Sequence, residues 1–201
     1  MKKVLLITDG SCAGNPGPGG WAAILRFGEK KKELFGYESL TTNNRMELMA
    51  VIQGLLAMHE RCQVEITTDS EYVLQGATLS LPRWKACHWW RGKFPLRNAD
   101  LWIELDELLS VHNVSWKWTK GHSNHDDNNR CDWLAQHAAR TQSSSWSDKP
   151  RSALKYEYGW QYVPPRPQGS LFENAFEHTE EETDDDSISA ADLDARLSDT
   201  E

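Results

Sequence analysis

The sequence predicts a mixed α/β fold in which one sheet has an antiparallel part and a parallel part. Three strand-like segments follow one another near the N-terminus, and helical and strand patterns alternate after them. Consecutive strands favour antiparallel pairing, whereas alternation with helices favours parallel pairing through crossovers. All clear periodicity lies in residues 1–141, so we expect a single domain there.

The strands are predicted from short apolar or alternating runs bounded by turn residues. The first run stops at a Gly- and Pro-rich stretch, so Asp9 is expected at the end of its strand. Gly28 and Glu29 join the second and third strands in hairpin fashion. The five predicted strands span residues 3–9, 20–28, 30–39, 63–69 and 113–121.

The helices are predicted from apolar side chains that recur at helical spacing. In the longest helix, Thr41 or Thr42 can cap the start. Pro82 is expected to interrupt the helix that precedes the basic segment 81–98. The four predicted helices span residues 41–60, 70–77, 98–112 and 126–142.

Composition excludes several classes of protein. The chain of 201 residues has no stretch of about 20 apolar residues, so no membrane span is expected. The N-terminal apolar run ends at Thr8, which is too short for a signal peptide and favours a cytoplasmic protein. The four cysteines show no CxxC pairing, which is typical of reduced thiols.

The charge of the chain is unevenly distributed. Residues 168–201 hold 12 acidic residues and one Arg, a balance of −11, whereas the preceding residues have a balance of +3. We interpret 142–167 as an irregular linker with aromatic residues and Pro, and 168–201 as a disordered tail. The tail is a solubilising segment, a competitor for a substrate groove, or an arm for a replication or repair partner. The mildly basic body is compatible with a nucleic-acid substrate.

Four carboxylates occupy positions that suit metal binding. Asp9 and Asp69 end two apolar runs, and ligands collect at strand ends in α/β sheets. Glu47 and Asp132 lie between apolar neighbours on predicted helices. Clustered carboxylates repel one another, and a hard cation such as Mg²⁺ offsets that repulsion.

The turn after Asp9 allows three interpretations: a phosphate-binding loop, a metal site, or a turn that needs Asp and Gly for its backbone angles. A phosphate loop needs Lys and Ser or Thr after its glycines, and GSCAGNPGPGGW contains no Lys. Asp9 is therefore interpreted as a metal ligand, and the glycines as allowing a backbone to approach closely.

Several long motifs closely resemble the bacterial type 1 ribonuclease H family, from about residue 3 to 141. They are TDGSCAGNPGPGGWAAIL, TTNNRMELMA, TDSEYV, ADLW and KGHSNHDDNNRCDWLA. The resemblance implies a five-stranded mixed sheet with helices on both sides. It also implies Mg²⁺-dependent endonucleolytic cutting of the RNA strand in RNA–DNA hybrids. The matching catalytic positions are Asp9, Glu47, Asp69, His122 and Asp132.

The resemblance also implies a mechanism with two Mg²⁺ ions, for which Mn²⁺ is a possible substitute. Asp9 is expected to bridge both ions, with Glu47 and Asp69 on one and Asp132 on the other. The expected products carry a 5′-phosphate and a 3′-hydroxyl. His122, in a polar loop, is expected to carry protons or help product release, with His125 as its competitor.

Residues that match family positions at the hybrid are mostly polar. An Asn amide donates and accepts, which suits recognition of a 2′-hydroxyl. Glu71 departs from the pattern, because relatives carry Gln there and a carboxylate repels phosphate. The implied hybrid contacts are Gly10, Cys12, Asn15, Thr42, Asn43, Asn44 and Asn128.

Residues 81–98 match the family's basic protrusion, which grips the DNA strand. Tryptophans alternate there with basic residues, so charge supplies affinity and the rings supply packing or stacking. For Trp84 a place in the core is an equal alternative. The expected contacts are Trp84, Lys85, Trp89 and Arg91.

Two other functions compete with a hybrid-cutting, monomeric enzyme. A non-catalytic hybrid-binding module would normally have lost one of the four acids, and all four are present. A Holliday-junction resolvase of the same fold is disfavoured by the pair Asn43 and Asn44 and by the basic protrusion.

Overall fold

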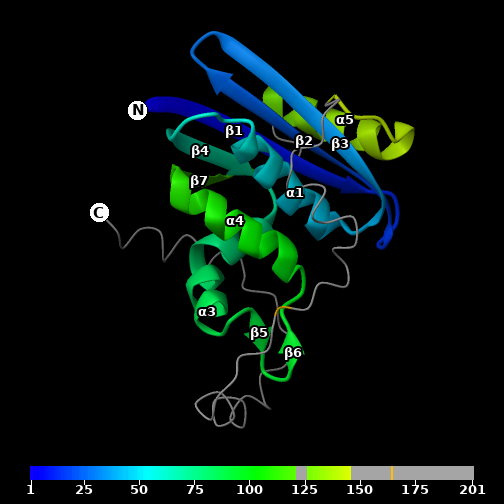
Figure 1. The fold of residues 1–201 in the computed structure, drawn as a ribbon. Coiled ribbons are helices and arrows are strands. Elements are labelled where there is room, and N and C mark those ends of the chain that lie inside the picture. The colour runs from blue at the N-terminus through cyan, green and yellow to red at the C-terminus, as the bar shows by residue number, and fades with distance from the viewer. Residues whose placement is uncertain (121–125, 146–163, 165–201) are drawn as a thin grey trace.

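A five-stranded sheet forms the centre of the molecule in the computed structural model, which describes residues 1–120, 126–145 and 164 (Figure 1). The strand order is β3-β2-β1-β4-β7. The pairs β1–β2 and β2–β3 are antiparallel, and β1–β4 and β4–β7 are parallel, which confirms the predicted mixed sheet. The strands are β1 (Lys2–Cys12), β2 (Gly17–Phe27), β3 (Lys30–Thr41), β4 (Cys62–Thr68) and β7 (Asn113–Trp118).

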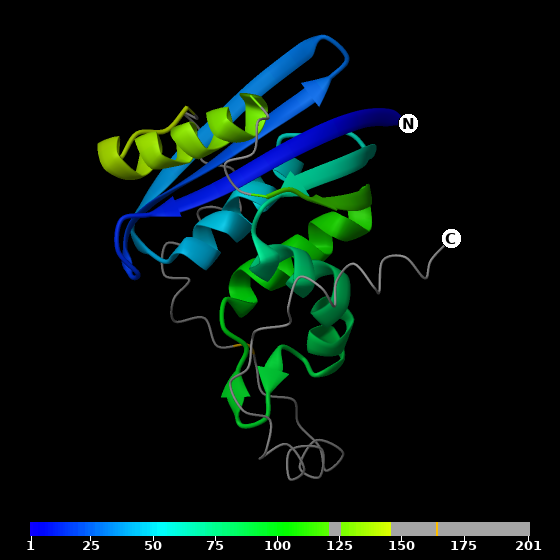
Figure 2. The same ribbon diagram turned by 180° about the vertical axis from the view of Figure 1, so that it is seen from behind.

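Helices cover both faces of the sheet. Helix α5 packs on β1, β2 and β3, while α1 lies on the opposite face with α4 packed beside it (Figure 2). A small hairpin, β5 (Trp90–Arg91) and β6 (Phe94–Pro95), projects beyond α3. The helices are α1 (Asn43–Leu56), α2 (Glu71–Gln75), the π-helix η1 (Gly76–Ser80), α3 (Leu81–Ala86), α4 (Ala99–Val111) and α5 (Asp126–Thr141). Within the described ranges, no helix combines the length and the apolar character that crossing a membrane requires.

Strand β1 separates two hydrophobic cores. Successive side chains of a strand point to opposite faces, so Leu6 joins the core under α1 and Ile7 the core under α5. Both side chains are almost fully buried. This burial on both faces explains why the first predicted strand is apolar throughout rather than alternating.

The end of β1 differs from the prediction. Asp9 is not at the end of its strand, because β1 continues to Cys12. The parallel ladder to β4 stops at the pair Ile7–Thr67, whereas the antiparallel ladder to β2 runs on to Cys12–Gly19. Asp9 therefore lies just beyond the parallel part of the sheet while its backbone is still paired on the other side.

Other features also differ from the prediction. Helix α1 ends at Leu56, before the predicted end at residue 60, and Thr42 takes the N-cap position without a side-chain capping bond. Pro82 does not interrupt a helix but lies in the first turn of α3, directly after the π-helical turn. Proline suits a first helical turn because no backbone N–H is needed there. The hairpin β5–β6 was not predicted, since its strands have two residues each.

Helix α5 lies unusually close to β2. A Cβ atom added to Gly20 would be 2.2 Å from the carbonyl oxygen of Ala135. Ala135 and Ala138 are fully buried at this contact. The small residues on both elements therefore allow the short distance between α5 and β2.

A buried ion pair joins α1 to α4. The two terminal nitrogens of Arg45 donate to the carboxylate of Asp100 at 3.0 and 2.6 Å. Their side chains are only 7% and 1% exposed. Removing one partner of a buried pair leaves the other charge without compensation, which costs far more than replacing both.

We therefore predict that Asp100→Ala lowers the free energy of unfolding by about 3–5 kcal/mol. The double variant Arg45→Met/Asp100→Leu should recover most of that loss, because no charge is then left buried. Urea unfolding of the three proteins measures both effects. An equal loss in the single and double variants would show that the packing of α1 on α4, rather than the charge, carries the cost.

Candidate active site

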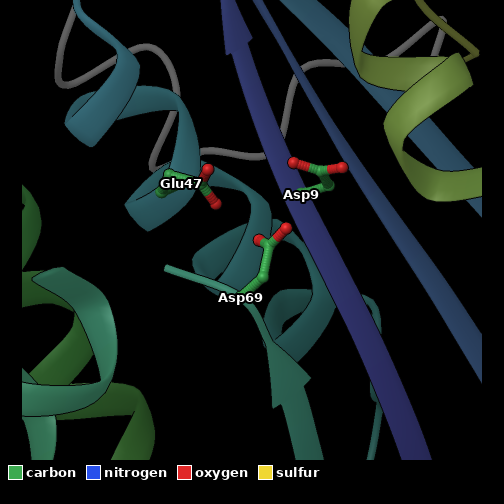
Figure 3. A group of neighbouring side chains, drawn as sticks. All are labelled: Asp9, Glu47 and Asp69. Carbon is green, nitrogen blue, oxygen red and sulfur yellow. The ribbon is translucent and has the colours of Figure 1, made fainter. Parts of the chain in front are cut away.

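Three carboxylates converge at one end of the sheet (Figure 3). Asp9 comes from β1, Glu47 from α1, and Asp69 directly follows β4. One oxygen from each lies within 4.8 Å of the others. Three of the four acids singled out in the sequence are thus brought together, from elements that lie far apart in the chain.

The close approach of α1 to β1 positions Glu47. A Cβ atom on Gly10 would lie 2.4 Å from the backbone nitrogen of Glu47, so no other residue fits without moving the helix. The backbone N–H of Gly10 donates hydrogen bonds to Asp9 and to Glu47. This confirms that a glycine after Asp9 allows close backbone approach.

The site is electrostatically costly for the chain alone. Burial raises the pKa of Asp9 to about 8, and the nearby charges of Asp69 and Asp132 add to the rise. Burial also raises the pKa of Glu47 well above its usual value, and Asp9 and Asp69 contribute. Without a cation Asp9 holds a proton near neutral pH, since like charges in a desolvated site cannot all ionise.

The donor set fits a hard divalent cation. Among the residues that the structure describes, the Oε2 atom of Glu47 is buried and has no hydrogen-bond partner. An unpaired buried carboxylate oxygen is costly, and here it belongs to the group of three carboxylates. Because the group offers only oxygen ligands, it suits Mg²⁺ or Mn²⁺ better than a softer metal.

Asp132 lies beside the group rather than within it. It is half-buried on α5 and accepts a hydrogen bond from Nε2 of Gln136 at 2.6 Å. Its charge nevertheless raises the pKa of Asp9 and of the buried thiol of Cys131. Asp132 is therefore electrostatically coupled to the site. His122, the fifth predicted catalytic residue, lies outside the described residues, as does His125.

Most of the predicted hybrid contacts lie near the end of β1 or at the start of α1. Gly10 and Cys12 are in β1, and the thiol of Cys12 donates weakly to the carbonyls of Gly17 and Thr41. The exposed residues are Asn15, in the loop after β1, and Asn43 and Asn44, in the first turn of α1 after the half-buried Thr42.

Asn128 is a special case among these polar residues. It is buried in the first turn of α5, and its Oδ1 atom has no partner within the described part of the chain. Glu71, the departure from the family pattern, is the exposed first residue of α2, two positions after Asp69.

The residues of the basic protrusion divide into packed and exposed groups. Trp84 lies 4.9 Å from Trp102, ring centre to ring centre, and with Trp89 it packs against the core under α1. Lys85 forms an ion pair with Asp106 at 2.7 Å, and Arg91 is exposed on β5. For Trp84 the geometry favours the core alternative.

Comparison with known proteins identifies the class. Residues 1–140 match the family model for RNase H. The ribonuclease H of Solibacter usitatus is 62% identical over 146 residues, which cover 72% of this chain and 100% of that protein. The ribonuclease H of Hydrogenovibrio crunogenus is 55% identical over 139 residues, which cover 69% and 96%.

Solved structures agree in fold. LC9-RNase H1, a type 1 RNase H with the type 2 active-site motif, is 28% identical, with a TM-score of 0.66 over 85% of this chain and 90% of that one. LC11-RNase H1, solved in complex with an RNA/DNA hybrid, is 20% identical, with a TM-score of 0.52 over 69% and 97%. At that identity the second likeness supports the fold alone.

The mixed sheet and its acidic group thus define a metal-dependent hydrolase of the ribonuclease H-like class. The chain belongs to the ribonuclease H family, whose members cleave the RNA strand of RNA–DNA hybrids. It is therefore an endoribonuclease.

Two contacts of the structure go beyond what the sequence predicts, one beside the site and one on the hairpin. Arg45 lies two residues before Glu47, and its pairing with Asp100 could have been suspected from a charged residue on an apolar helix face. Nothing in the sequence indicated that the indole of Trp90 donates to the carbonyl of Pro164, at 3.2 Å.

The raised pKa of Asp9 predicts an unusual pH dependence of stability without divalent cations. The folded chain holds a proton on Asp9 up to about pH 8, whereas the unfolded chain releases it near pH 4. Raising the pH through this window therefore favours the unfolded state. We predict that Asp9→Asn does not lose stability in this way as the pH rises. Its free energy of unfolding at pH 7 should exceed that of the parent by about 2–4 kcal/mol.

Urea unfolding in a chelator, from pH 4 to pH 8, measures the difference between the two proteins. Glu107→Gln, which changes an exposed carboxylate on α4, is the matched control and should follow the parent at each pH. The stability advantage of Asp9→Asn over the parent should grow as the pH rises. An advantage that stays constant or shrinks would contradict the claim that the carboxylate of Asp9 is buried without a compensating charge.

Proposed function

We propose that the chain cuts the RNA strand of RNA–DNA hybrids with two Mg²⁺ ions, leaving a 5′-phosphate and a 3′-hydroxyl. The observation that carries the proposal is the convergence of Asp9, Glu47 and Asp69 in a chain of the ribonuclease H family. Asp132 completes the set by its electrostatic coupling to Asp9. Mn²⁺ would substitute for Mg²⁺ in the same oxygen-ligand site.

The four carboxylates have separate roles in this proposal. Asp9 belongs to the group with Glu47 and Asp69 and is also coupled electrostatically to Asp132, so we assign it contact with both ions, Glu47 and Asp69 with one ion and Asp132 with the other. When bound, the ions supply the positive charge that activates a water and stabilises the leaving 3′-oxygen. The buried, unpaired oxygen of Glu47 supports its role as a ligand.

Polar groups around the site would orient the substrate. The exposed Asn43 and Asn44 and the carbonyls near Gly10 offer donors and acceptors for 2′-hydroxyl groups. Thr42 would contact a phosphate of the DNA strand, and Asn15 and Asn128 lie on the substrate side in the same proposal. His122 would carry a proton or help product release.

The protrusion would hold the DNA strand mainly by charge. Arg91 and Lys85 supply the positive charge, and Trp89 supplies packing against the core as well as a surface near the hairpin. Glu71 would weaken a phosphate contact at its position. A monomeric state, a cytoplasmic location and a replication or repair partner remain predictions.

The decisive experiment is cleavage of an end-labelled hybrid beside duplex DNA and duplex RNA, with and without Mg²⁺. We predict that Asp9→Asn lowers the cleavage rate by about a thousandfold or more, because several kcal/mol of charge stabilisation are lost. Glu107→Gln should keep the parent rate. A folded Asp9→Asn protein with full activity in Mg²⁺ would contradict the proposal.

The same experiment separates the competing functions. A hybrid-binding module would bind the hybrid without cutting it, and a junction resolvase would cut branched DNA and leave the RNA strand intact.

A further inference from the structure

The chain beyond α5 contacts the domain at two described places. The backbone N–H of Ser145 donates to the carbonyl of Phe35 on β3 at 3.0 Å. Nineteen positions later, the carbonyl of Pro164 accepts a hydrogen bond from the indole nitrogen of Trp90 on β5 at 3.2 Å, and Pro164 is buried. The chain is thus attached to the hairpin at Pro164, which lies beyond the residues 1–140 that the family model matches.

The surface around this attachment is basic. Residues 83–97, which we call the hairpin surface, contain five Lys or Arg residues and no acidic residue. Arg83, Arg91 and Arg97 are exposed. Such a surface attracts any chain of negative charges, and salt weakens the attraction.

The segment that follows Pro164 carries the complementary charge. Residues 168–201 have a balance of −11. Gln168 follows four positions after Pro164, so an extended chain of that length spans no more than about 14 Å. The segment's first acid, Glu173, follows nine residues after Pro164. Attachment at this distance gives the acidic segment an effective concentration in the mM range, by order of magnitude.

We propose that the hairpin surface is a docking site for the acidic segment 168–201 of the same chain, which competes there with the phosphates of nucleic acid. The hydrogen bond from Trp90 holds Pro164 beside the hairpin, four positions before the segment begins. The competition rests on the proposed function, since it requires that the hairpin surface binds the hybrid. The docking of the acidic segment on the hairpin surface does not rest on the proposed function.

Two full-length variants with matched changes test the charge. The first neutralises six acids of the segment: Glu180→Gln, Glu181→Gln, Glu182→Gln, Asp184→Asn, Asp185→Asn and Asp186→Asn. The second keeps every charge by exchanging Glu and Asp at the same six positions. Hybrid binding is measured for both variants and the parent in a chelator, so that no strand is cut.

We predict that the neutralised variant binds the hybrid roughly five- to tenfold more tightly than the parent at about 20 mM salt. The charge-preserving variant should match the parent. The difference should fall below about twofold at 0.3 M salt, where the screening length is under 8 Å. Equal binding by the two variants at low salt would overturn the competition.

A second readout tests the docking without nucleic acid. Carbodiimide cross-linking joins a lysine amine to a nearby carboxylate, and mass spectrometry of the parent should find Lys93 linked to acids of residues 173–186. Trp90→Phe removes the indole donor and should reduce these links several-fold. Absence of links in the parent would overturn the docking. Links in a parent that binds no hybrid would support the docking and contradict the proposed function.

Discussion

The mutual repulsion of three clustered carboxylates, two of them buried, is the constraint on which the rest of the structure depends. Asp9 and Glu47 are almost fully buried, and Asp69 lies within 4.8 Å of both. A fold that served only stability would not gather these groups, because their desolvation and repulsion oppose folding. The site therefore makes sense as a cation site, in which the bound charge replaces the protons that the acids otherwise hold.

The scaffold holds these groups in place against their repulsion. Strand β1 is buried on both faces, so Asp9 cannot move away by rotating its strand. Gly10 lets α1 approach the strand, and the ion pair between Arg45 and Asp100 fixes the start of that helix to α4. The packing interactions of the scaffold thus hold in place a site that is unfavourable by itself, as is common for functional sites.

The sequence predicted the order and type of the long elements because their apolar patterns are strong. It placed Asp9 at a strand end, whereas the structure extends β1, because register between strands cannot be read from one segment. It left Trp84 between core and surface, which only its contact with Trp102 could decide. The two-residue strands of the hairpin and the attachment of Pro164 depend on long-range contacts, which no local pattern contains.

Calorimetric titration of the full chain with Mg²⁺ at pH 7, in buffers of different ionisation enthalpy, tests the cation site most directly. Because the pKa of Asp9 is about 8 without a cation, we expect binding to release about one proton, seen as a heat that varies linearly with the buffer's ionisation enthalpy. In Asp9→Asn this proton release should disappear. Mg²⁺ binding whose heat is independent of the buffer would contradict the protonated, buried state of the site.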